Sequence, residues 1–572
     1  IIAYSYFYTM KKILSVLLLF GAVAYGQNGI PTDYFSNPLD INLVLAGNFG
    51  EMRANHFHSG LDLKTEQREG LPVYAPADGY VSRINVQHYG YGKALYILHP
   101  NGYTTVYGHL RSFAGDIEKY VKDTQYSKET FEIELFPDKA LLPIKKGDLI
   151  AYTGNTGGSG GPHLHFEIRD SSQRPMNPLL FGIEIPDSKE PIVSAIFAYP
   201  IGEDAHVNQS QNRTKLRMIK QKDGNYKTED IKAFGKIGFG ITTYDQQDGA
   251  SNKNGAYSIE TRFNGSQKFK VLFDKFSFSE TRYLNRYTDY NYYETNKSMV
   301  QKLFRETNNP LSIITEEDDN GFITVKDSLQ SIYTIEVNDF KGNRMYISVP
   351  IEGAKLEILE PKNIEKTDDY IYADHATSIT KGKWSIYIPA NSLYEDTYLD
   401  IKDEGDVLKF HEDLIPIHNN ISITADISSY NETDRDKLYI GRLNYRGQPY
   451  YTSTTRNGNK LTAKTRTFGN YTIASDTTSP TIKPINFSEG KWISNQNFLQ
   501  LKITDDLSGI SSYRATINEK FILMEYDYKK DVLTYNFNDN VNLETENNLK
   551  VIVIDNVGNS ATFEAKFFRK QP

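Results

Sequence analysis

Short runs in which apolar and polar residues alternate, separated by turns rich in Asn, Asp and Gly, make up most of the chain. In an extended strand this alternation places apolar side chains on one face and polar side chains on the other. Residues 71–86 and 94–110 are two such runs, and Pro100-Asn101-Gly102 inside the second is typical of a tight turn. We therefore expect a β hairpin that ends at His109 and, for the whole chain, a mainly β fold.

Composition and length agree with this pattern. Tyr and Phe, which favour strands, occur 41 and 30 times. At about 100 to 200 residues per domain, a chain of 572 residues predicts three to five domains. The net charge is −8 and the Lys and Arg residues are dispersed, so we expect no nucleic-acid partner.

The segment GPHLHFEIR, residues 161–169, combines strand alternation with two histidines. His163 and His165 are two positions apart, so in a strand both imidazoles point to one face, while the apolar residues point to the other. Three interpretations are open on this pattern alone. The histidines are surface residues, or two metal ligands, or one metal ligand beside one catalytic base.

Histidines are concentrated early in the chain, with seven of the 11 between residues 56 and 165. In that window, HFHSGLDLKT places His58 four residues before Asp62, close enough for both to bind one cation. The chain has no cysteine, so any metal must be held by His and carboxylate. A catalytic zinc keeps three protein ligands and a water, so one more histidine is needed, and GPHLHFEIR offers it.

An export signal is predicted at residues 10–26, MKKILSVLLLFGAVAYG, which has two lysines, an apolar run too short to span a bilayer, and small residues at its end. Gln27 is then the expected mature N-terminus. No later run of 18 apolar residues follows, so we expect no membrane span after cleavage. We expect the protein in the periplasm or at the cell surface. The lack of cysteine excludes disulfides and a cysteine nucleophile.

The motifs HSGLD, YGHL and GPHLHFE, in this order, resemble those of the lysostaphin/LytM-type zinc metalloendopeptidases, which cut peptide bonds in peptidoglycan. The similarity extends over residues 46–180. It implies an antiparallel-sheet, LytM-type (duplicated hybrid motif-like) peptidase domain, which we expect at residues 27–186, with peptidoglycan stem peptides as substrate and Zn²⁺ as cofactor.

The resemblance also implies roles for five residues. His58, Asp62 and His165 would bind the zinc ion. His109 and His163 would flank the metal-bound water as catalytic residues, with the division of proton transfer between them unassigned. We expect Glu167 at most to orient a ligand, and His56 and His99 to have no catalytic role. No role is expected for His88, His206, His375, His411 and His418.

The segment between YGHL and KKGD, about residues 111–144, is longer than the connection usual in the family. It contains a predicted short helix at residues 114–125. Next to the site, such an insertion could shape substrate choice or cover the groove.

An internal repeat marks the rest of the chain. Residues 238–265 resemble 498–520, residues 333–349 resemble 549–565, and each copy opens with Asp-x-x-x-Pro, at Asp187 and Asp476. These copies are similar to immunoglobulin-like or fibronectin type III-like sandwiches. We expect two or three β-sandwich domains, at residues 187–353 with a Tyr-rich insertion, 354–475 with no assigned role, and 476–572.

Four turn aspartates of these domains, Asp339, Asp505, Asp506 and Asp555, admit two interpretations. Clustered carboxylates bind calcium, whereas isolated turn aspartates cap backbone groups, which is the more common use.

Two functions are therefore compared. The first is a secreted zinc endopeptidase that cleaves peptidoglycan crosslinks and is positioned by its C-terminal β domains, through an envelope protein partner or the wall itself. The second is an envelope scaffold or regulator that uses the peptidase fold for binding. The five intact site residues favour the enzyme. The bond that is cut is not determined by the sequence.

Overall fold

The structure, a computed structural model, describes residues 29–539 and 544–570. The chain is 46% strand and 7% helix, which confirms the mainly β prediction. The predicted export signal, residues 10–26, lies outside the described residues. Among the helices that the structure describes, none combines the length and the hydrophobicity needed to cross a bilayer.

The first unit, residues 29–186, is built on an antiparallel nine-stranded sheet. Its hydrogen-bonded strands lie in the order β1 (Leu45–Gly47), β4 (Leu61–Lys64), β13 (His163–Arg169), β8 (Thr104–Gly108), β7 (Lys93–Leu98), β6 (Gly79–Val86) and β10 (Ile133–Leu135). Two further strands pair with it, β11 (Pro143–Ile144) with β6 and β14 (Pro175–Met176) with β13. Two smaller sheets complete the unit, one of β5 (Pro72–Tyr74), β12 (Leu149–Tyr152) and β9 (Ser112–Phe113), the other of β2 (Met52–Arg53) and β3 (His56–Phe57). The predicted hairpin is β7 and β8, and β13 lies between β4 and β8.

The second unit, residues 187–353, has 12 strands linked into one sheet. Its path runs through β16 (Thr214–Leu216), β15 (Ile192–Val207), β19 (Ile231–Tyr244), β26 (Arg344–Gly353), β25 (Gln330–Asn338), β20 (Ser258–Phe263), β21 (Ser266–Leu272) and β23 (Ile314–Glu317). Attached are β17 (Met218–Lys220), β18 (Tyr226–Thr228), β22 (Gln301–Lys302) and β24 (Ile323–Val325). The Tyr-rich insertion carries α3 (Leu284–Tyr287) and α4 (Tyr290–Asn296).

The third unit, residues 354–475, has two five-stranded sheets and one strand pair. One sheet contains β28 (Thr377–Lys381), β29 (Trp384–Ile388), β33 (Ile421–Asp426), β37 (Lys460–Thr465) and β36 (Thr454–Asn457). The other contains β31 (Ile401–Glu404), β32 (Val407–Phe410), β38 (Gly469–Ser475), β34 (Leu438–Leu443) and β35 (Pro449–Tyr451), and β27 (Asp369–Ile371) pairs with β30 (Thr397–Leu399).

The fourth unit, residues 476–570, has a four-stranded and a five-stranded sheet. The first contains β39 (Thr481–Pro484), β41 (Phe498–Thr504), β45 (Val532–Asn536) and β44 (Met524–Asp527). The second contains β40 (Lys491–Trp492), β47 (Ser560–Phe568), β46 (Glu546–Asp555), β42 (Ile510–Ile517) and β43 (Lys520–Phe521).

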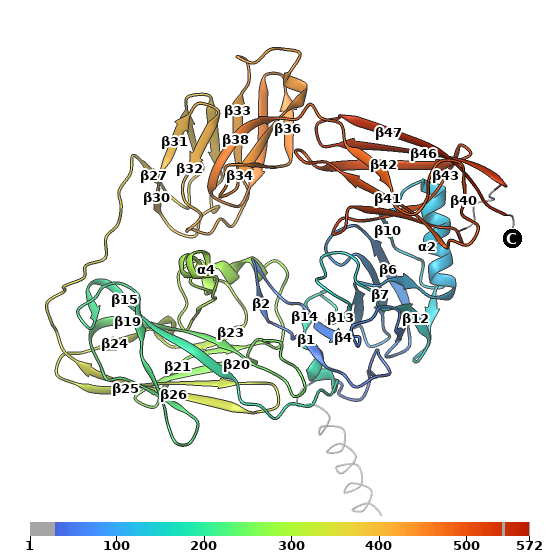
Figure 1. Ribbon diagram of the computed structural model, residues 1–572. Helices are drawn as coiled ribbons and strands as arrows, with labels where there is room; N and C mark the ends of the chain where they lie inside the picture. Colours follow the sequence, from blue (N-terminus) through green and yellow to red (C-terminus); the bar gives the residue numbers. More distant parts are fainter. Residues whose placement is uncertain (1–28, 540–543, 571–572) are drawn as a thin grey trace, which may run out of the picture.

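Buried apolar side chains form one continuous core through the first two units and a separate core in each of the other two. The units follow one another around a ring, and the fourth returns to lie against the first (Figure 1). The first unit is therefore in contact with both of the units that carry the internal repeat.

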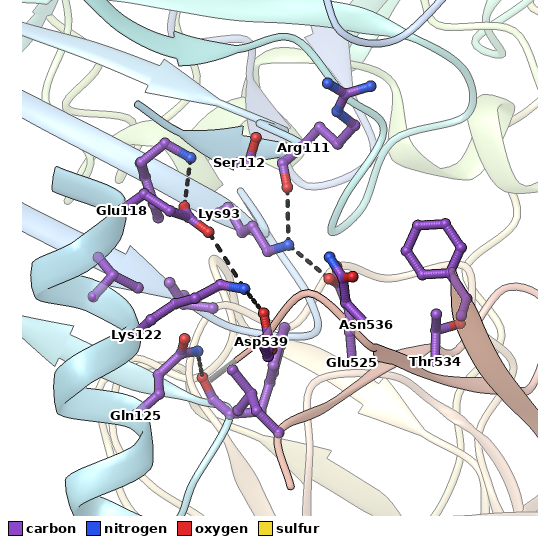
Figure 2. Close-up of a pocket in the computed structure, with 16 residues that line it drawn as sticks. Lys93, Arg111, Ser112, Glu118, Lys122, Gln125, Glu525, Thr534, Asn536 and Asp539 are labelled. Carbon is purple, nitrogen blue, oxygen red and sulfur yellow. Dashed lines mark hydrogen bonds and ion pairs between the residues drawn. The ribbon is translucent and has the colours of Figure 1, made fainter. Parts of the chain in front are cut away.

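The insertion of the first unit, about residues 111–144, forms part of the contact between the first and fourth units. Its helix α2 (Gly115–Lys128) buries Ile117 and Val121, one turn apart, on the core side and includes most of the helix predicted at residues 114–125. Its outer face meets the fourth unit, where Lys122 pairs with Asp539. Figure 2 shows this junction, a cavity of about 480 Å³ in which Lys93 Nζ donates to Glu525 at 2.7 Å.

Candidate metal centre

The register of three neighbouring strands brings the predicted site residues together. On β13, His165 lies opposite Asp62 of β4 and opposite Gly108 of β8. Opposed residues of antiparallel strands point to the same face, so the side chains of His165 and Asp62 meet. His109 directly follows β8 with a left-handed backbone, φ 58°. Four of the five predicted site residues, Asp62, His109, His163 and His165, thus lie on strands of the sheet or directly after one.

His58 enters from the segment between β3 and β4. That segment turns sharply at Gly60, where a Cβ atom would lie 2.3 Å from the Phe166 carbonyl oxygen. Only glycine fits such a close approach to the next strand. The glycine in the middle of HSGLD therefore allows His58 and Asp62 to converge.

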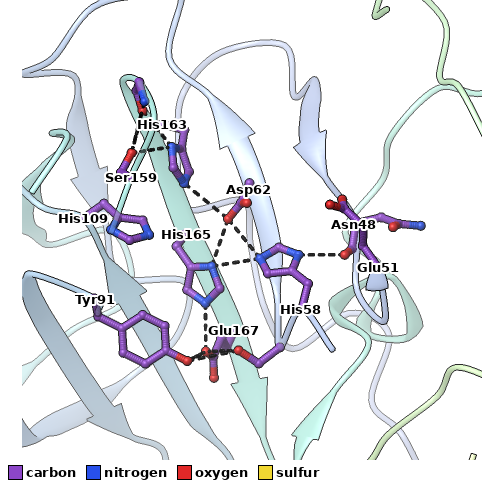
Figure 3. Close-up of polar contacts among 12 residues, drawn as sticks. Asn48, Glu51, His58, Asp62, Tyr91, His109, Ser159, His163, His165 and Glu167 are labelled. Atoms are coloured by element: carbon purple, nitrogen blue, oxygen red, sulfur yellow. Dashed lines mark hydrogen bonds and ion pairs between the residues drawn. The ribbon is translucent and has the colours of Figure 1, made fainter. Parts of the chain in front are cut away.

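Three ligand atoms converge in the site (Figure 3). Asp62 Oδ1 lies 3.0 Å from His58 Nε2 and 2.9 Å from His165 Nδ1, and the two nitrogens are 3.0 Å apart. All three side chains are buried. They form one of the groups that could hold a metal ion.

The outer nitrogens of both histidines have acceptors of their own. His58 Nδ1 lies 2.7 Å from the Asn48 carbonyl oxygen, and His165 Nε2 lies 2.8 Å from Glu167 Oε1. A nitrogen that donates to such an acceptor leaves the other nitrogen of the same ring with a lone pair. Two nitrogen lone pairs and a carboxylate oxygen then face one point, which is the donor set that suits a metal ion.

Burial and charge act on the ligands in opposite directions. Burial alone would raise the pKa of Asp62, but His58 and hydrogen bonds from His163 and His165 hold it well below its usual value. Arg53 adds to this by donating to Asp62 Oδ2 at 2.6 Å. Burial would lower the pKa of His165, but Asp62 and Glu167 raise it to about 9. Asp62 is therefore ionised, and a metal ion that binds His165 Nδ1 would have to displace a proton from that ring.

Glu167 links the ligands to the surrounding strands. It is fully buried and accepts hydrogen bonds from Ser59 Oγ at 2.7 Å, Tyr91 OH at 2.5 Å and Arg169 Nε at 2.6 Å, besides its contact with His165. Burial would raise its pKa, but Arg169 and His165 lower it far below the usual value. Glu167 therefore stays ionised and holds the His165 ring in place.

His109 and His163 stand beside these ligands. Nδ1 of His109 is 2.8 Å from the Thr156 carbonyl oxygen, and Nδ1 of His163 is 2.8 Å from that of Gly161. Their ring centroids are 4.8 Å apart, and His163 Nε2 lies 3.4 Å from Asp62 Oδ1. Burial, with His165 and His163 next in effect, lowers the pKa of His109 to about 3, so this ring is neutral at neutral pH.

The loop that accepts these two hydrogen bonds, residues 154–161, is also held by the fourth unit. Lys529 Nζ donates to the carbonyl oxygens of Asn155 and Ser159 at 2.5 and 3.1 Å, and Tyr528 OH donates to that of Gly157 at 3.2 Å. The fourth unit thus contacts the backbone that orients both histidines.

The other early histidines lie outside the group. His56 is exposed and its Nδ1 lies 2.9 Å from the Ala54 carbonyl oxygen. His99 is buried between the Asp78 carbonyl oxygen and the Thr105 hydroxyl. His88 stacks on Phe131. The structure therefore brings together the five predicted site residues and leaves these three out.

Sequence reasoning missed the residues that surround the ligands. Arg53, Tyr91 and Asn48 contact a ligand or Glu167 and lie outside the quoted motifs, and Ser59 lies inside HSGLD, where nothing in the sequence reveals its contact with Glu167. Their contacts depend on how the strands are placed in space.

An open groove of about 870 Å³ begins at His163. Its walls come from β1, β4 and the glycine-rich loop of the first unit, and from Gly249 and Asn252 of the second. Residues of both units therefore line the groove beside His163.

Comparison with known proteins agrees with this geometry. An uncharacterized metalloprotease of Haemophilus influenzae is 36% identical over 138 residues, 24% of this chain and 23% of that protein. The DD-carboxypeptidase/endopeptidase Mpg of Neisseria meningitidis is 32% identical over 148 residues, 26% and 28% of the two chains. The peptidoglycan DD-endopeptidase ShyC of Vibrio cholerae is 29% identical over 152 residues, 25% and 29% of the two chains. The chain thus matches less than a third of the length of each of these relatives.

Two family models match the chain. The model of the Zu5-like domain matches residues 368–476, most of the third unit, and the model of peptidase family M23 matches residues 56–126 and 139–178. The second match contains all five predicted site residues and omits part of the insertion. The first unit of the chain is therefore a peptidase family M23 domain.

Proposed function

We propose that the protein is an exported, zinc-dependent endopeptidase that hydrolyses peptide crosslinks of bacterial peptidoglycan. The observation that carries the proposal is the convergence of two imidazole nitrogens and one carboxylate oxygen, with two further imidazoles beside them. The names of the relatives, a metalloprotease and two DD-endopeptidases, support a role in cell-wall hydrolysis.

His58, Asp62 and His165 would hold the zinc ion. Two neutral imidazoles and one carboxylate leave it a net positive charge, and zinc in such a site polarises a scissile carbonyl and lowers the pKa of water to about 7. Asn48 and Glu167 fix the two rings so that the required nitrogens face inward.

His109 and His163 would move the protons. With Nδ1 of each ring bonded to a loop carbonyl, Nε2 is the nitrogen left to act. One of these rings would take a proton from the attacking water and the other would deliver a proton to the leaving amine, since hydrolysis of a peptide bond needs both transfers.

The groove supports a peptide substrate, because its volume is about 870 Å³ and His163 is one of the residues that line it. Stem peptides of peptidoglycan would enter between the first and second units. The predicted export signal at residues 10–26 agrees with a substrate outside the cytoplasm, in the periplasm or at the cell surface. The β units that follow would position the enzyme, through the wall or an envelope protein partner.

The proposal is tested by digesting purified sacculi with the mature protein carrying one equivalent of zinc. Mass spectrometry should detect peptides cleaved at the crosslink. His109→Ala should retain zinc and release no fragments, whereas His56→Ala, an exposed histidine outside the site, should leave the yield unchanged.

The scaffold alternative gives a different outcome. An unaltered protein that retains zinc and binds sacculi without releasing fragments would contradict the enzyme and support the scaffold. Equal fragment yields from the unaltered protein and His109→Ala would contradict the role of His109.

A further inference from the structure

Two groups of three aspartates lie outside the metal centre. The first aspartate cluster is Asp187, Asp245 and Asp339, and the second aspartate cluster is Asp476, Asp505 and Asp555. In each cluster the three carboxylates offer oxygen atoms that lie within 4.8 Å of one another. No side chain other than aspartate belongs to either group.

The clusters occupy equivalent positions of the internal repeat. Each begins with the aspartate of Asp-x-x-x-Pro, adds the aspartate that follows β19 or β41, and ends with that of an Asp-x-x-Gly-Asn turn. In the turn, Asn343 Nδ2 donates to the Asp187 carbonyl oxygen at 3.3 Å, and Asn559 Nδ2 donates to that of Asp476 at 3.0 Å. Each copy of the repeat therefore brings together three carboxylates at equivalent positions of its fold.

In the part of the chain that the structure describes, the clustered carboxylates accept hydrogen bonds from neutral groups, for example Asp339 from the backbone and side-chain amides of Asn343. Among the described residues, no Lys, Arg or His forms an ion pair with any of the six carboxylates. Three buried or half-buried carboxylates at such short range repel one another, because water screens them poorly. Burial, with Asp187 and Asp339 next in effect, raises the pKa of Asp245 to about 7.

A separate observation at the first cluster indicates a missing ligand. Asn254 is 3% exposed, and neither its side-chain oxygen nor its side-chain nitrogen has a hydrogen-bond partner in the described structure. Its backbone exchanges two hydrogen bonds of 2.8 Å with Asp245, across an antiparallel bridge. Opposed residues of such a bridge point to one face, so the Asn254 carboxamide lies on the cluster side. Asp245 Oδ1, also buried, has no partner either.

A buried amide without partners is costly, and it is explained when its oxygen binds a cation. We propose that Asp187, Asp245 and Asp339 bind a calcium ion, with the side-chain oxygen of Asn254 as a fourth ligand. The donors are all oxygen and no nitrogen is offered, which selects a hard cation. Calcium accepts irregular sets of six to eight oxygens, so backbone carbonyls and water can complete the shell.

The position of the ion gives it a further effect. Asp245 and Asn254 are the two ends of the loop 246–253, and Gly249 and Asn252 of that loop line the groove. The loop also meets the peptidase domain directly, where Gln247 Oε1 accepts from the Leu45 amide at 3.0 Å. An ion at the base of the loop would thus hold one wall of the substrate groove. This effect on the groove, unlike the binding itself, rests on the proposed function.

Calorimetric titration of CaCl₂ into the full chain, stripped of metals and reloaded with zinc, tests the binding. The unaltered protein should bind calcium saturably, and Asp245→Asn should bind one equivalent fewer. Asp506→Asn is the matched control, because this exposed aspartate adjoins Asp505 but lies outside the second cluster. No saturable binding, or the same stoichiometry in Asp245→Asn, would overturn the proposal. Magnesium binding as tightly as calcium would overturn the choice of ion.

Thermal unfolding provides a second measurement that does not depend on any variant. Calcium should raise the Tm of the unaltered chain, and Asp245→Asn should lose most of that rise. If Asp245→Asn does not fold, Asp187→Asn replaces it, because Asp187 is less buried. The titration is repeated on His109→Ala, where unchanged calcium affinity separates this site from the peptidase function. A calcium-independent Tm of the unaltered chain would contradict the proposal.

Discussion

The metal centre and the first aspartate cluster each bring three ligand atoms within 4.8 Å, but they do so with different donors. The metal centre offers two imidazole nitrogens and one carboxylate oxygen, whereas the cluster offers carboxylates alone. Imidazole favours zinc and similar metals, and carboxylate favours hard cations. One chain therefore contains two sites that should select different ions.

The two sites also differ in how they neutralise charge. His58 and hydrogen bonds from the other histidines keep the pKa of Asp62 low, and Arg53 donates to its second oxygen, so its charge is stabilised by the protein itself. Burial, and after it the charges of Asp187 and Asp339, raise the pKa of Asp245. The metal centre is thus organised before the ion binds. The aspartate cluster needs an ion to stabilise its charge, and we expect the ion there to be structural.

Loss of a zinc ligand should have the largest effect. His58→Ala removes one of three ligands, so we expect loss of both bound zinc and peptide hydrolysis, measured by metal analysis and fragment release. Calcium stoichiometry should be unchanged, which separates the two sites. His56→Ala, two residues away, should behave like the unaltered protein; zinc retained at full occupancy in His58→Ala would contradict the ligand assignment.

Glu167→Gln should have a smaller effect on the same site. The amide can no longer serve as an ionised acceptor for His165 and Arg169, so His165 is held less firmly. We expect zinc affinity to fall by about 10- to 100-fold, the range found for partners of metal ligands. Competition with a chromogenic chelator measures it, and an unchanged affinity would refute the role of Glu167.

The aspartate cluster should show its own dependence on pH. The folded-state pKa of Asp245 is raised to about 7 from 3.8, so its contribution to stability is present in full at acid pH and is lost as pH rises through about 7. The Tm of calcium-free protein should therefore fall between about pH 4 and 7 and level off above about pH 8, and the rise caused by calcium should grow over the same range. In Asp245→Asn the Tm of calcium-free protein should depend less on pH. The same pH dependence of the Tm in that variant would contradict the role given to Asp245.

The smallest effect is expected from the fourth unit. Lys529→Ala removes two hydrogen bonds to the loop that orients His109 and His163. Turnover should fall by less than in any ligand variant, with zinc and calcium content unchanged. Lys530→Ala is the control, because Lys530 pairs with Asp527 instead. Equal turnover in the two variants would show that the contact has no influence on the site.

The five site residues could be predicted from the sequence because they lie in short motifs. Alternation predicted that His163 and His165 share a face, and the spacing of His58 and Asp62 indicated a cation site. The resemblance supplied His109 and the role of each residue. The β7–β8 hairpin followed from its turn. These features depend on residues that are close in the sequence or on strand periodicity.

Other features depend on long-range packing and could not be predicted. Arg53 of β2 reaches Asp62 of β4 because of how the strands of the first unit are arranged. Lys529 reaches Ser159 only because the fourth unit lies against the first. The aspartate clusters were visible in part, since Asp339, Asp505 and Asp555 stand in repeated turns. Asp506 lies outside the second cluster, and Asp245 was not singled out. Whether an aspartate belongs to a cluster depends on the direction in which its side chain points from the turn. The sequence does not reveal this direction.

The central claim is that the two histidines of β13 have different roles, and one paired measurement tests it. His163→Ala and His165→Ala are purified in parallel, and zinc content and release of crosslink fragments are measured on the same samples. We predict that His165→Ala loses zinc and activity, while His163→Ala keeps zinc and loses about 10²- to 10⁴-fold in rate. Loss of zinc in both variants, or full activity with zinc in His163→Ala, would contradict the account.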